Sequence, residues 1–320
     1  MGIKSLNRYL LERCSKRSIN KQHLREYANK TLVIDTSIYM YKFAAEDALI
    51  ENMYLMISIF KKYHITPIFI FDGKPPNEKK DLLSQRRADK KDAQQKYNVM
   101  KTVLDNQVLN EDERKTIICD MDILKKQFIR IKDADIQKTK ALMSAYGVTY
   151  FDALGEADAL CCYLVKTGRA WGCVSDDMDM FVYGCARVIR HLSLLNHTVI
   201  FYDTEKILND INMTEGNFRD IMVLSGTDYN INNETNLVET LKWFNEYSKS
   251  NDTMEFYDWL SKYTKYVKNK ESLINIRNMF ILDCEDNHLR NAEFYEYCEM
   301  KTHIGKLKNI LSDDGFMFVY

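Results

Sequence analysis

Proline is nearly absent from this sequence of 320 residues, and its placement limits the architectures to be considered. Only Pro67, Pro75 and Pro76 occur, all within one short stretch, and glycine is also uncommon, with 11 residues. A collagen-like or low-complexity chain would need far more of both residues. Because no proline follows residue 76, none interrupts the helical patterns that fill the rest of the sequence.

The sequence also lacks paired cysteines and long apolar runs. Its eight cysteines form no CxxC pair, and Cys284 and His288, the one Cys/His pair at ligand-like spacing, do not make a zinc site. No window of about 18 uncharged apolar residues occurs, so we expect no membrane span. The N-terminal sequence MGIKSL has no apolar signal core, and Leu6 stands where myristoylation requires Ser or Thr. We therefore expect reduced, mostly buried thiols and no contact with a membrane.

Charge is nearly balanced overall, at −1, but it is unevenly distributed along the chain. Residues 1–30 carry eight Lys/Arg against two Glu, and residues 74–101 carry nine Lys/Arg against four acids. Residues 151–185 reverse this pattern, with six acids against two Lys/Arg. An acidic centre with basic segments elsewhere is typical of an enzyme that binds cations and a polyanion. Solvated helix faces are the alternative explanation for each charge run taken alone.

Short apolar runs alternate with helical patterns through the first two thirds of the chain and predict a sheet. Six such runs read as strands: Thr31–Asp35, Ile65–Asp72, Val148–Asp152, Ala170–Ser175, Arg187–His191 and Thr198–Tyr202. Strands separated by helices favour an α/β fold with a mostly parallel central sheet flanked by helices on both faces.

The helical patterns predict the rest of the architecture. A long helical stretch covers Ser37–Tyr63, and Gly147 and Gly168 stand where glycines end helices. Residues 77–136 are highly charged, contain no glycine or proline, and are too long for an ordinary connection, so they predict a helical insertion. We expect a core over residues 1–245, which includes this insertion, and a helical C-terminal region over residues 246–320 packed on the core.

Carboxylates follow four of the predicted strands at the point where each strand ends. In an open α/β sheet, ligands bind beyond the carboxyl ends of the strands. The acidic residues at these ends are Asp35, Asp72, Glu156, Asp158, Asp177 and Asp179. Any one of them could instead cap the following helix. For Asp35 taken alone, capping is as good an explanation as metal binding. Six at corresponding places predict one acidic cluster.

Like charges gathered at one edge of a sheet are costly unless cations neutralise them. Oxygen ligands without histidine or cysteine favour Mg²⁺, for which Mn²⁺ can substitute. Two such ions about 4 Å apart can activate a water and stabilise both the attacking and the leaving oxygen of a phosphodiester. The cluster therefore predicts metal-dependent phosphodiester hydrolysis.

The motifs around these carboxylates resemble those of the flap-endonuclease/XPG family of structure-specific nucleases, and more closely its poxviral members. They occur in the family's order over roughly residues 1–230: MGIKSL, VIDTSIYMY, FDGKPP, YFDALGEADAL, VSDDMDMFVYG and FRDIMVLSGTDY. The resemblance implies a PIN-like or resolvase-like nuclease core whose helical insertion lies over the active site.

The resemblance also implies roles for individual residues. Its metal ligands fall on the six carboxylates above and on Asp228, which the spacing of strands would not have found. Asp158 stands where the family usually has Glu. Lys79 and Arg86 fall where basic residues of the insertion reach the scissile phosphate, although Lys80, Arg87 and Lys90 compete in the alignment.

Two positions are implied to contact DNA. Tyr41 falls where the family stacks an aromatic ring on a base, although a core position in an amphipathic helix would also account for it. Gly2, N-terminal once Met1 is removed, would approach DNA closely. The family's Gly-Ile-Gly hairpin, whose amides grip duplex phosphates, has no counterpart, because no glycine occurs from Thr227 to Leu241. No sliding-clamp peptide is present either.

These features together favour a structure-specific DNA endonuclease, with 5′→3′ exonuclease activity as a further expectation. The poxviral resemblance implies action on branched or junction DNA in viral replication, recombination and repair in the host cytoplasm, alongside viral replication proteins. One alternative is an RNA-directed 5′→3′ exoribonuclease, which shares the MGI start and an element like that from Asp72 to Lys79. The other is a catalytically inactive nuclease fold that serves as a DNA-binding scaffold.

Overall fold

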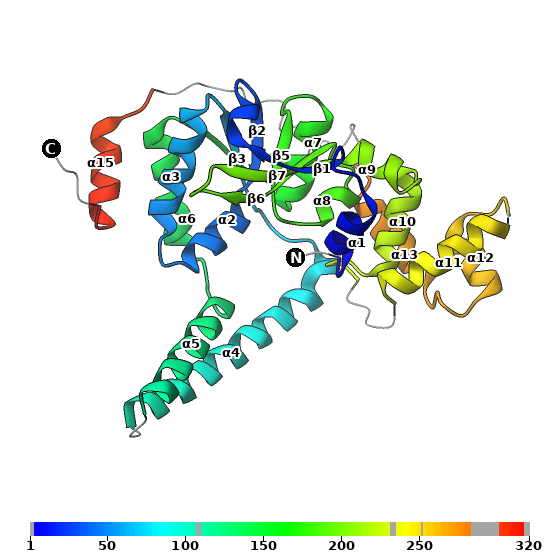
Figure 1. Cartoon of the computed structure of the whole chain (residues 1–320), viewed down its shortest axis with the longest axis horizontal. Coiled ribbons are helices and arrows are strands. Elements are labelled where there is room, and N and C mark those ends of the chain that lie inside the picture. Colours follow the sequence, from blue (N-terminus) through cyan, green and yellow to red (C-terminus); the bar gives the residue numbers. More distant parts are fainter. Residues whose placement is uncertain (1–2, 107–109, 231–234, 251, 283–300, 317–320) are drawn as a thin grey trace.

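A computed structural model describes residues 3–106, 110–230, 235–250, 252–282 and 301–316. Its centre is a seven-stranded sheet with the strand order β1-β7-β6-β5-β2-β3-β4 (Figure 1). The strands are β1 (Ile19–His23), β2 (Thr31–Asp35), β3 (Thr66–Phe71), β4 (Thr149–Asp152), β5 (Gly172–Val174), β6 (Arg187–Ser193) and β7 (Thr198–Asp203).

The sheet is mostly parallel, as predicted. β2 pairs in parallel with β3 and β5, while β4 and β6 extend the parallel part on either side. β7 and β1 add an antiparallel edge. All six predicted strands form, within a few residues of their expected ends. β1 was not predicted because its sequence INKQH is polar, as an edge strand tolerates.

Helices cover both faces of the sheet. Alternate residues of β2 point to opposite faces, so they pack into two different apolar clusters. Leu32 and Ile34 pack with α2 (Thr36–Ala44), α3 (Leu49–Lys62) and α6 (Asp133–Tyr146). Val33 packs into the second apolar cluster. The helices of that cluster include α1 (Leu6–Arg13), α7 (Ala157–Lys166), α8 (Asp179–Val182), α9 (Thr204–Asp210) and α10 (Glu215–Ser225).

Two helices end at the glycines that the sequence predicted, but one predicted helix is divided in two. Gly147 and Gly168 follow α6 and α7 with φ of 73° and 74°, in the left-handed conformation expected of glycines that end helices. The single helix expected over 37–63 is instead two, α2 and α3. Asp47 lies in the connection with φ of 53°, and aspartate is among the residues that tolerate this conformation.

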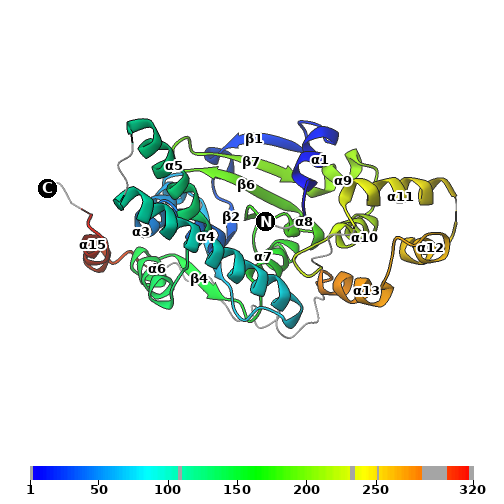
Figure 2. The same ribbon diagram turned by 90° about the horizontal axis from the view of Figure 1, so that it is seen from below.

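The predicted insertion is helical and projects from the body of the protein (Figure 1). It begins with a short 3-10 turn, η2 (Asn77–Lys79), and continues with α4 (Lys80–Asn106) and α5 (Glu111–Gln127), which pack against each other. Viewed from below, α4 crosses in front of the body of the protein (Figure 2). A second 3-10 turn, η1 (Leu24–Tyr27), precedes β2.

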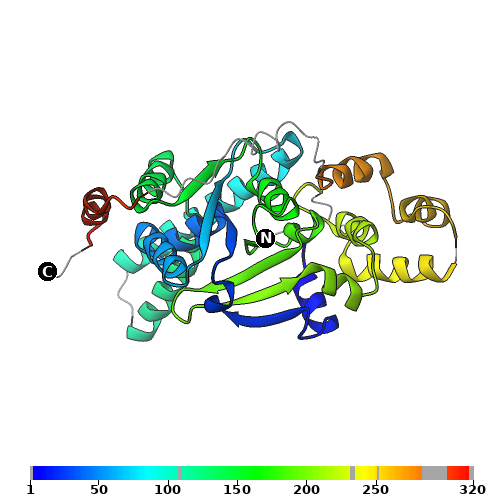
Figure 3. The same cartoon turned by 90° about the horizontal axis from the view of Figure 1, so that it is seen from above.

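The C-terminal region is helical where the structure describes it, and it lies in two places. The helices α11 (Leu237–Ser250), α12 (Phe256–Tyr263) and α13 (Lys270–Met279) lie beside α10, whereas α15 (Ile304–Asp313) packs on α6. The two groups are at opposite ends of the molecule (Figures 1 and 3). The expected division at residue 245 falls inside α11. No described helix combines the length and the apolarity needed to span a membrane.

A buried ion pair connects α10 to α13. Arg277 Nε lies 2.6 Å from Asp220 Oδ1, and the Asp220 side chain is only 10% exposed. Burial raises the pKa of Asp220 to about 6, although the charge of Arg277 opposes this shift. The carboxyl is thus ionised in neutral solution and depends on Arg277 for compensation.

We expect Arg277→Ala to lower the free energy of unfolding by about 3 kcal/mol at pH 8, because it leaves a buried charge unpaired. A folded-state pKa raised to about 6 means that Asp220 is mostly protonated at pH 5, so the loss should shrink there. Urea unfolding of variant and wild type at both pH values measures the difference. Lys249→Ala, which removes an exposed pair with Glu246, is the control and should cost under about 0.5 kcal/mol. An Arg277→Ala loss independent of pH would contradict this account.

Candidate active site

All seven predicted acidic residues lie in one cluster at the carboxyl ends of the parallel strands. Burial first, and then the charge of Asp72, raise the pKa of Asp35 to about 8. Burial and the charges of Asp177, Asp228 and Glu156 raise the pKa of Asp179. Burial and the charges of Asp35 and Asp177 raise the pKa of Asp158. The four residues Asp35, Asp177, Asp179 and Asp228 are buried, Glu156 and Asp158 are half-buried, and Asp72 is exposed at the rim.

Asp35 belongs to this cluster and does not cap the following helix. It occupies the N-cap position of α2, but its side chain makes no capping hydrogen bond. Instead, Asp35 Oδ2 accepts a hydrogen bond from Ser175 Oγ at 2.9 Å. The capping alternative is therefore wrong for this residue.

Ser175 orders the loop that carries two further acids. Its Oγ accepts a hydrogen bond from the Asp177 backbone N–H at 3.1 Å, and Asp177 Oδ1 accepts one from the Asp179 N–H at 3.0 Å. Ser175 is not among the site residues predicted from the sequence, although it is the first residue of the SDDMD motif. Its place at the end of β5 was the signal that could have identified it.

Asp72 is positioned by close contact between two loops. The N–H of Ala157, in the first turn of α7, donates to Asp72 Oδ1 at 2.8 Å. The Gly73 N–H donates to the Gly155 carbonyl oxygen at 2.7 Å. A Cβ on Gly73 would lie 2.0 Å from the carbonyl oxygen of Ala153, so only glycine allows this approach. The FDG motif is thus a requirement of backbone packing beside the acidic cluster.

Two cations at the start of the insertion reach the cluster. Lys79 Nζ donates a hydrogen bond to Glu156 and lies 3.4 Å from Asp228 Oδ2. Arg86 donates to the same Asp228 oxygen at 2.8 Å. Burial lowers the pKa of Lys79, but the charges of Glu156 and Asp228 outweigh it and raise the pKa overall. Both side chains are therefore charged partners of the carboxylates.

Lys80, Arg87 and Lys90, the alternatives to Lys79 and Arg86 in the comparison with the family's motifs, lie elsewhere. Lys80 and Arg87 are exposed. Lys90 Nζ donates to the Ile129 carbonyl oxygen at 2.9 Å and lies 4.8 Å from the centre of the Tyr41 ring. The structure thus brings Lys79 and Arg86, and not their neighbours, to the acidic cluster.

The structure describes only one of the two residues predicted to contact DNA, Tyr41 and Gly2. Tyr41 is 44% exposed on α2, so it is not a core residue of that helix. Burial of its remaining surface, followed by the charge of Asp72, raises the pKa of its hydroxyl. Its ring is thus available beside the carboxylates. Gly2 lies outside the described residues.

Tyr229 is a further member of the site that the sequence analysis did not name. Its hydroxyl donates to Glu156 and lies 3.0 Å from the hydroxyl of Tyr183, and its ring lies 5.6 Å from Lys79 Nζ. It follows Asp228 directly in the GTDY motif, so the motif contained the signal. This hydrogen bond fixes one carboxylate oxygen of Glu156, while Lys79 holds the other.

The donor set fits a divalent cation. Every predicted ligand offers carboxylate oxygens, and Asp179 Oδ1 is buried without a hydrogen-bond partner. Burial also raises the pKa values of Asp158 and Asp179 well above the usual range, as unneutralised like charges do. Within the described ranges, no three acidic, histidine or cysteine side chains form a ready-made metal site. Lys79 and Arg86 hold carboxylates that the prediction assigns to metal.

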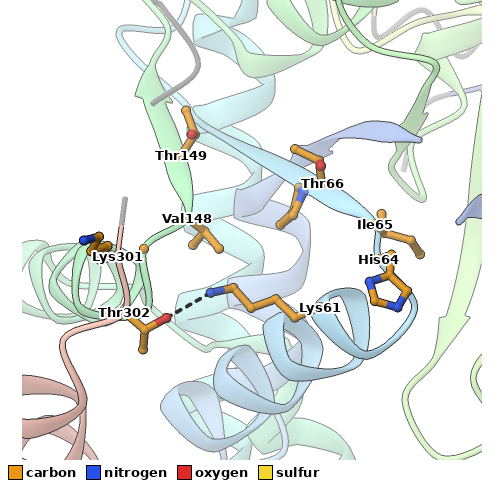
Figure 4. A pocket seen from close by; sticks show the side chains of 10 residues that line it. Lys61, His64, Ile65, Thr66, Val148, Thr149, Lys301 and Thr302 are labelled. Carbon is orange, nitrogen blue, oxygen red and sulfur yellow. Dashed lines mark hydrogen bonds between the residues drawn. The ribbon is translucent and has the colours of Figure 1, made fainter. Parts of the chain in front are cut away.

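A cavity of about 600 Å³ lies at the opposite edge of the sheet from the acidic cluster and has a different chemistry. Its walls include Thr66 and Thr149 at the starts of β3 and β4, with Lys61, His64 and Lys301 around them (Figure 4). Lys61 donates to Thr302 Oγ at 3.2 Å and so holds the segment before α15 against α3. No carboxylate lines this cavity, all of whose walls are described.

Comparisons with known proteins identify two matching family regions. The XPG N-terminal domain matches residues 1–93, and the XPG I-region matches residues 147–228. A flap endonuclease 1 from Methanococcus aeolicus is 30% identical over 232 residues, which cover 67% of this chain and 68% of that protein. The soybean (Glycine max) flap endonuclease 1 is 28% identical over 248 residues, and the match spans 72% of this chain and 62% of the longer soybean protein.

Solved structures show the same fold. The catalytic core of Rad2 in complex with a DNA substrate superposes with a TM-score of 0.66 at 20% identity, covering 98% of this chain and 96% of that one. Flap endonuclease-1 from Methanococcus jannaschii gives 0.58 at 22% identity, with 92% and 96% covered. Human GEN1 in complex with Holliday junction DNA gives 0.62 at 15% identity, with 98% and 73% covered. The PIN-like α/β core with a helical insertion is thereby confirmed.

If the cluster binds Mg²⁺, the ion should stabilise the folded protein without any reaction taking place. At 100 times its dissociation constant a ligand of the folded state adds about 2.7 kcal/mol. We expect Mg²⁺ to raise the thermal midpoint of the wild type and to raise that of Asp179→Asn much less. Without metal, Asp179→Asn should be at least as stable as the wild type, because one repelling carboxylate is gone.

Asp313→Asn is the matched control for this measurement. It removes the same charge from an exposed position of α15, far from the cluster, and should respond to Mg²⁺ as the wild type does. Differential scanning fluorimetry over a Mg²⁺ titration compares the three proteins. Equal stabilisation of all three would exclude Asp179 as a ligand.

Proposed function

Because the chain belongs to the flap-endonuclease/XPG family of nucleases, we propose that it is a metal-dependent, structure-specific endonuclease acting on branched DNA. The observation that carries the proposal is the single cluster of seven carboxylates with two cations reaching it from α4 and η2. A binding scaffold would gain nothing from burying several like charges together, whereas a hydrolase needs them.

The proposed ligands are the seven acidic residues of the cluster, and Mg²⁺, with Mn²⁺ as a substitute, is the proposed ion. Two bound ions would activate a water and stabilise the charge on the phosphodiester oxygens. Asp158 has a side chain one methylene shorter than the Glu that the family usually has at this position, but it still contributes a carboxylate to the cluster beside Asp35.

The remaining residues act on the substrate strand. Once cations neutralise Glu156 and Asp228, the side chains of Lys79 and Arg86 no longer have to pair with them. They then lie within reach of a phosphate held at the same carboxylates, where their charges oppose the negative charge that develops during hydrolysis. The exposed ring of Tyr41 offers a stacking surface for a base of that strand.

The biological setting of the proposal follows from the sequence motifs. Their similarity to those of poxviral nucleases supports action in replication, recombination and repair of viral DNA in the host cytoplasm, with viral replication proteins as partners. A 5′→3′ exonuclease activity at DNA ends would use the same site.

A cleavage panel tests the function directly. With Mg²⁺, the purified protein should cut at least one of four DNA substrates: a 5′ flap, a Holliday junction, a gapped duplex and a nicked duplex. A matched 5′-phosphorylated RNA is included because the element from Asp72 to Lys79 also resembles that of exoribonucleases. Cutting of RNA alone would assign the enzyme to RNA, and binding of branched DNA without cutting in either metal would favour the scaffold. Asp72→Ala should abolish cutting while DNA binding largely survives.

The roles of the two cations are tested by neighbouring pairs of residues. We expect Lys79→Ala to lower the single-turnover cleavage rate by about 10²–10³-fold, the usual loss for a group that stabilises transition-state charge. Lys80→Ala, one residue away and exposed, should change the rate less than about threefold. Arg86→Ala and the exposed Arg87→Ala form the second pair.

DNA binding, measured by fluorescence anisotropy with Ca²⁺, separates a catalytic role from a binding role. Lys79→Ala should retain most of the wild-type affinity. Equal rate losses for Lys79→Ala and Lys80→Ala would mean that the insertion contributes only a diffuse positive charge.

A further inference from the structure

The central sheet has a lateral edge at β1. β1 is the last strand in the order of the sheet, and its one strand neighbour is β7 (Figures 2 and 3). The two strands run antiparallel, with Ile19 opposite Tyr202 and His23 opposite Thr198. An edge strand leaves one row of backbone N–H and C=O groups outside the ladder, and another extended chain can pair with such a row.

Two hydrogen bonds at the ends of β1 fix which of its backbone groups face away from β7. The Asp203 N–H donates to the Ser18 carbonyl oxygen, and the Leu24 N–H donates to the His197 carbonyl oxygen, each at 2.9 Å. In an antiparallel pair, residues that bond to the neighbouring strand alternate with residues that do not. Ser18 and Leu24 both bond on the β7 side. The alternation therefore leaves three residues of β1 facing the lateral edge: Ile19, Lys21 and His23.

Most of these outward groups have no partner among the described residues. The Ile19 N–H donates to the Ser15 carbonyl oxygen at 3.1 Å. The backbone N–H and C=O groups of Lys21 and His23 form no further hydrogen bond within the part of the chain that the structure describes. The edge thus presents two donors and three acceptors in the order of a β-ladder, over about 17 Å for five residues.

The side chains around this edge are cationic. Four exposed cations lie on β1 or beside it in the sequence, and none forms an ion pair with a described residue: Lys16, Arg17, Lys21 and Arg25. The stretch 15–25 contains no acidic residue, and Asp210, which approaches it, accepts a hydrogen bond from Ser18 Oγ at 2.6 Å. Positive charge that is not compensated locally attracts an anionic partner.

The mixture of donors and acceptors along the edge determines which class of anion fits. A nucleic-acid phosphate only accepts hydrogen bonds, so the three outward carbonyl oxygens would repel it. A second copy of β1 would bring its own Lys21 close to this one, and like charges that face each other across strands are unfavourable. An extended acidic peptide meets neither obstacle, because its backbone supplies both donors and acceptors while its side chains supply carboxylates.

We propose that β1 binds an extended acidic segment of a partner protein, which adds an eighth strand to the sheet. The backbone of the partner pairs with Lys21 and His23, and its carboxylates contact the four cations. This binding requires neither a metal ion nor DNA, so it is independent of the proposed function.

A synthetic peptide tests the proposal on the full chain. The probe has seven residues in which glutamate alternates with valine, a fluorophore at one end and an amide at the other. We expect it to bind the wild type, measured by fluorescence anisotropy, and to slow amide hydrogen exchange at Lys21 and His23. Two further peptides carry methyl groups on alternate backbone nitrogens, one in each phase. At least one of them should bind on the order of tenfold more weakly, because a ladder hydrogen bond is lost.

Substitutions of Lys21 separate the backbone contribution from that of charge. Lys21→Ala removes one cation and should weaken binding severalfold, with a smaller effect at high salt. Lys21→Pro also removes the outward N–H but leaves the ladder with β7 intact, so a further loss on the order of tenfold is expected. Lys115→Ala, at an exposed position of α5, is the control and should bind the peptide as the wild type does. Thermal unfolding checks that Lys21→Pro remains folded.

The other occupants of the edge would give different results. Failure of the peptide to bind, or equal binding of the plain peptide and both methylated ones, overturns the proposal. Slower exchange at Lys21 and His23 with a DNA oligonucleotide, but not with the peptide, would assign the edge to nucleic acid instead. A wild-type dimer that Lys21→Pro abolishes, observed by sedimentation velocity, would assign it to a second copy of the chain and overturn the proposal as well.

Discussion

The repulsion among carboxylates at one edge of the sheet is the constraint to which the rest of the structure responds. Parallel strands end together, so acids that follow them are forced into proximity. One consequence is at Asp35: burial, and then the charge of Asp72, raise its pKa to about 8. Ser175 and the backbone N–H groups of Ala157 and Asp179 satisfy some of the carboxylate oxygens, but hydrogen bonds alone do not remove the charge.

The neutralising charge comes from a segment that the sheet does not require. Lys79 and Arg86 connect the start of the insertion to Glu156 before α7 and to Asp228 after α10. Three regions far apart in the sequence are therefore held together by charges that a metal ion would compete for. The base of α4 and any ion bound in the acidic cluster would therefore share the carboxylates of Glu156 and Asp228.

Local sequence predicted most of the fold and six of the seven acids, because each is encoded by a short pattern. An apolar run followed by an acid identifies both a buried strand and its end, as at Asp35. Asp228 follows a helix, so only its motif could predict it. Ser175 and Tyr229 were not predicted as site residues, because the acids to which they donate hydrogen bonds lie 140 and 73 residues away in the sequence. β1 escaped because its stability comes from pairing with β7, not from apolar residues of its own.

In the proposed enzyme, the selection of a DNA structure depends on DNA-binding surfaces outside the acidic cluster that would carry out the cleavage. The family's glycine hairpin grips a duplex by bringing backbone amides close to phosphates, and the stretch from Thr227 to Leu241 has no glycine with which to repeat that approach. Discrimination must then come from side chains. The basic stretch that begins the insertion attracts any phosphate backbone, single-stranded or duplex, and so selects weakly.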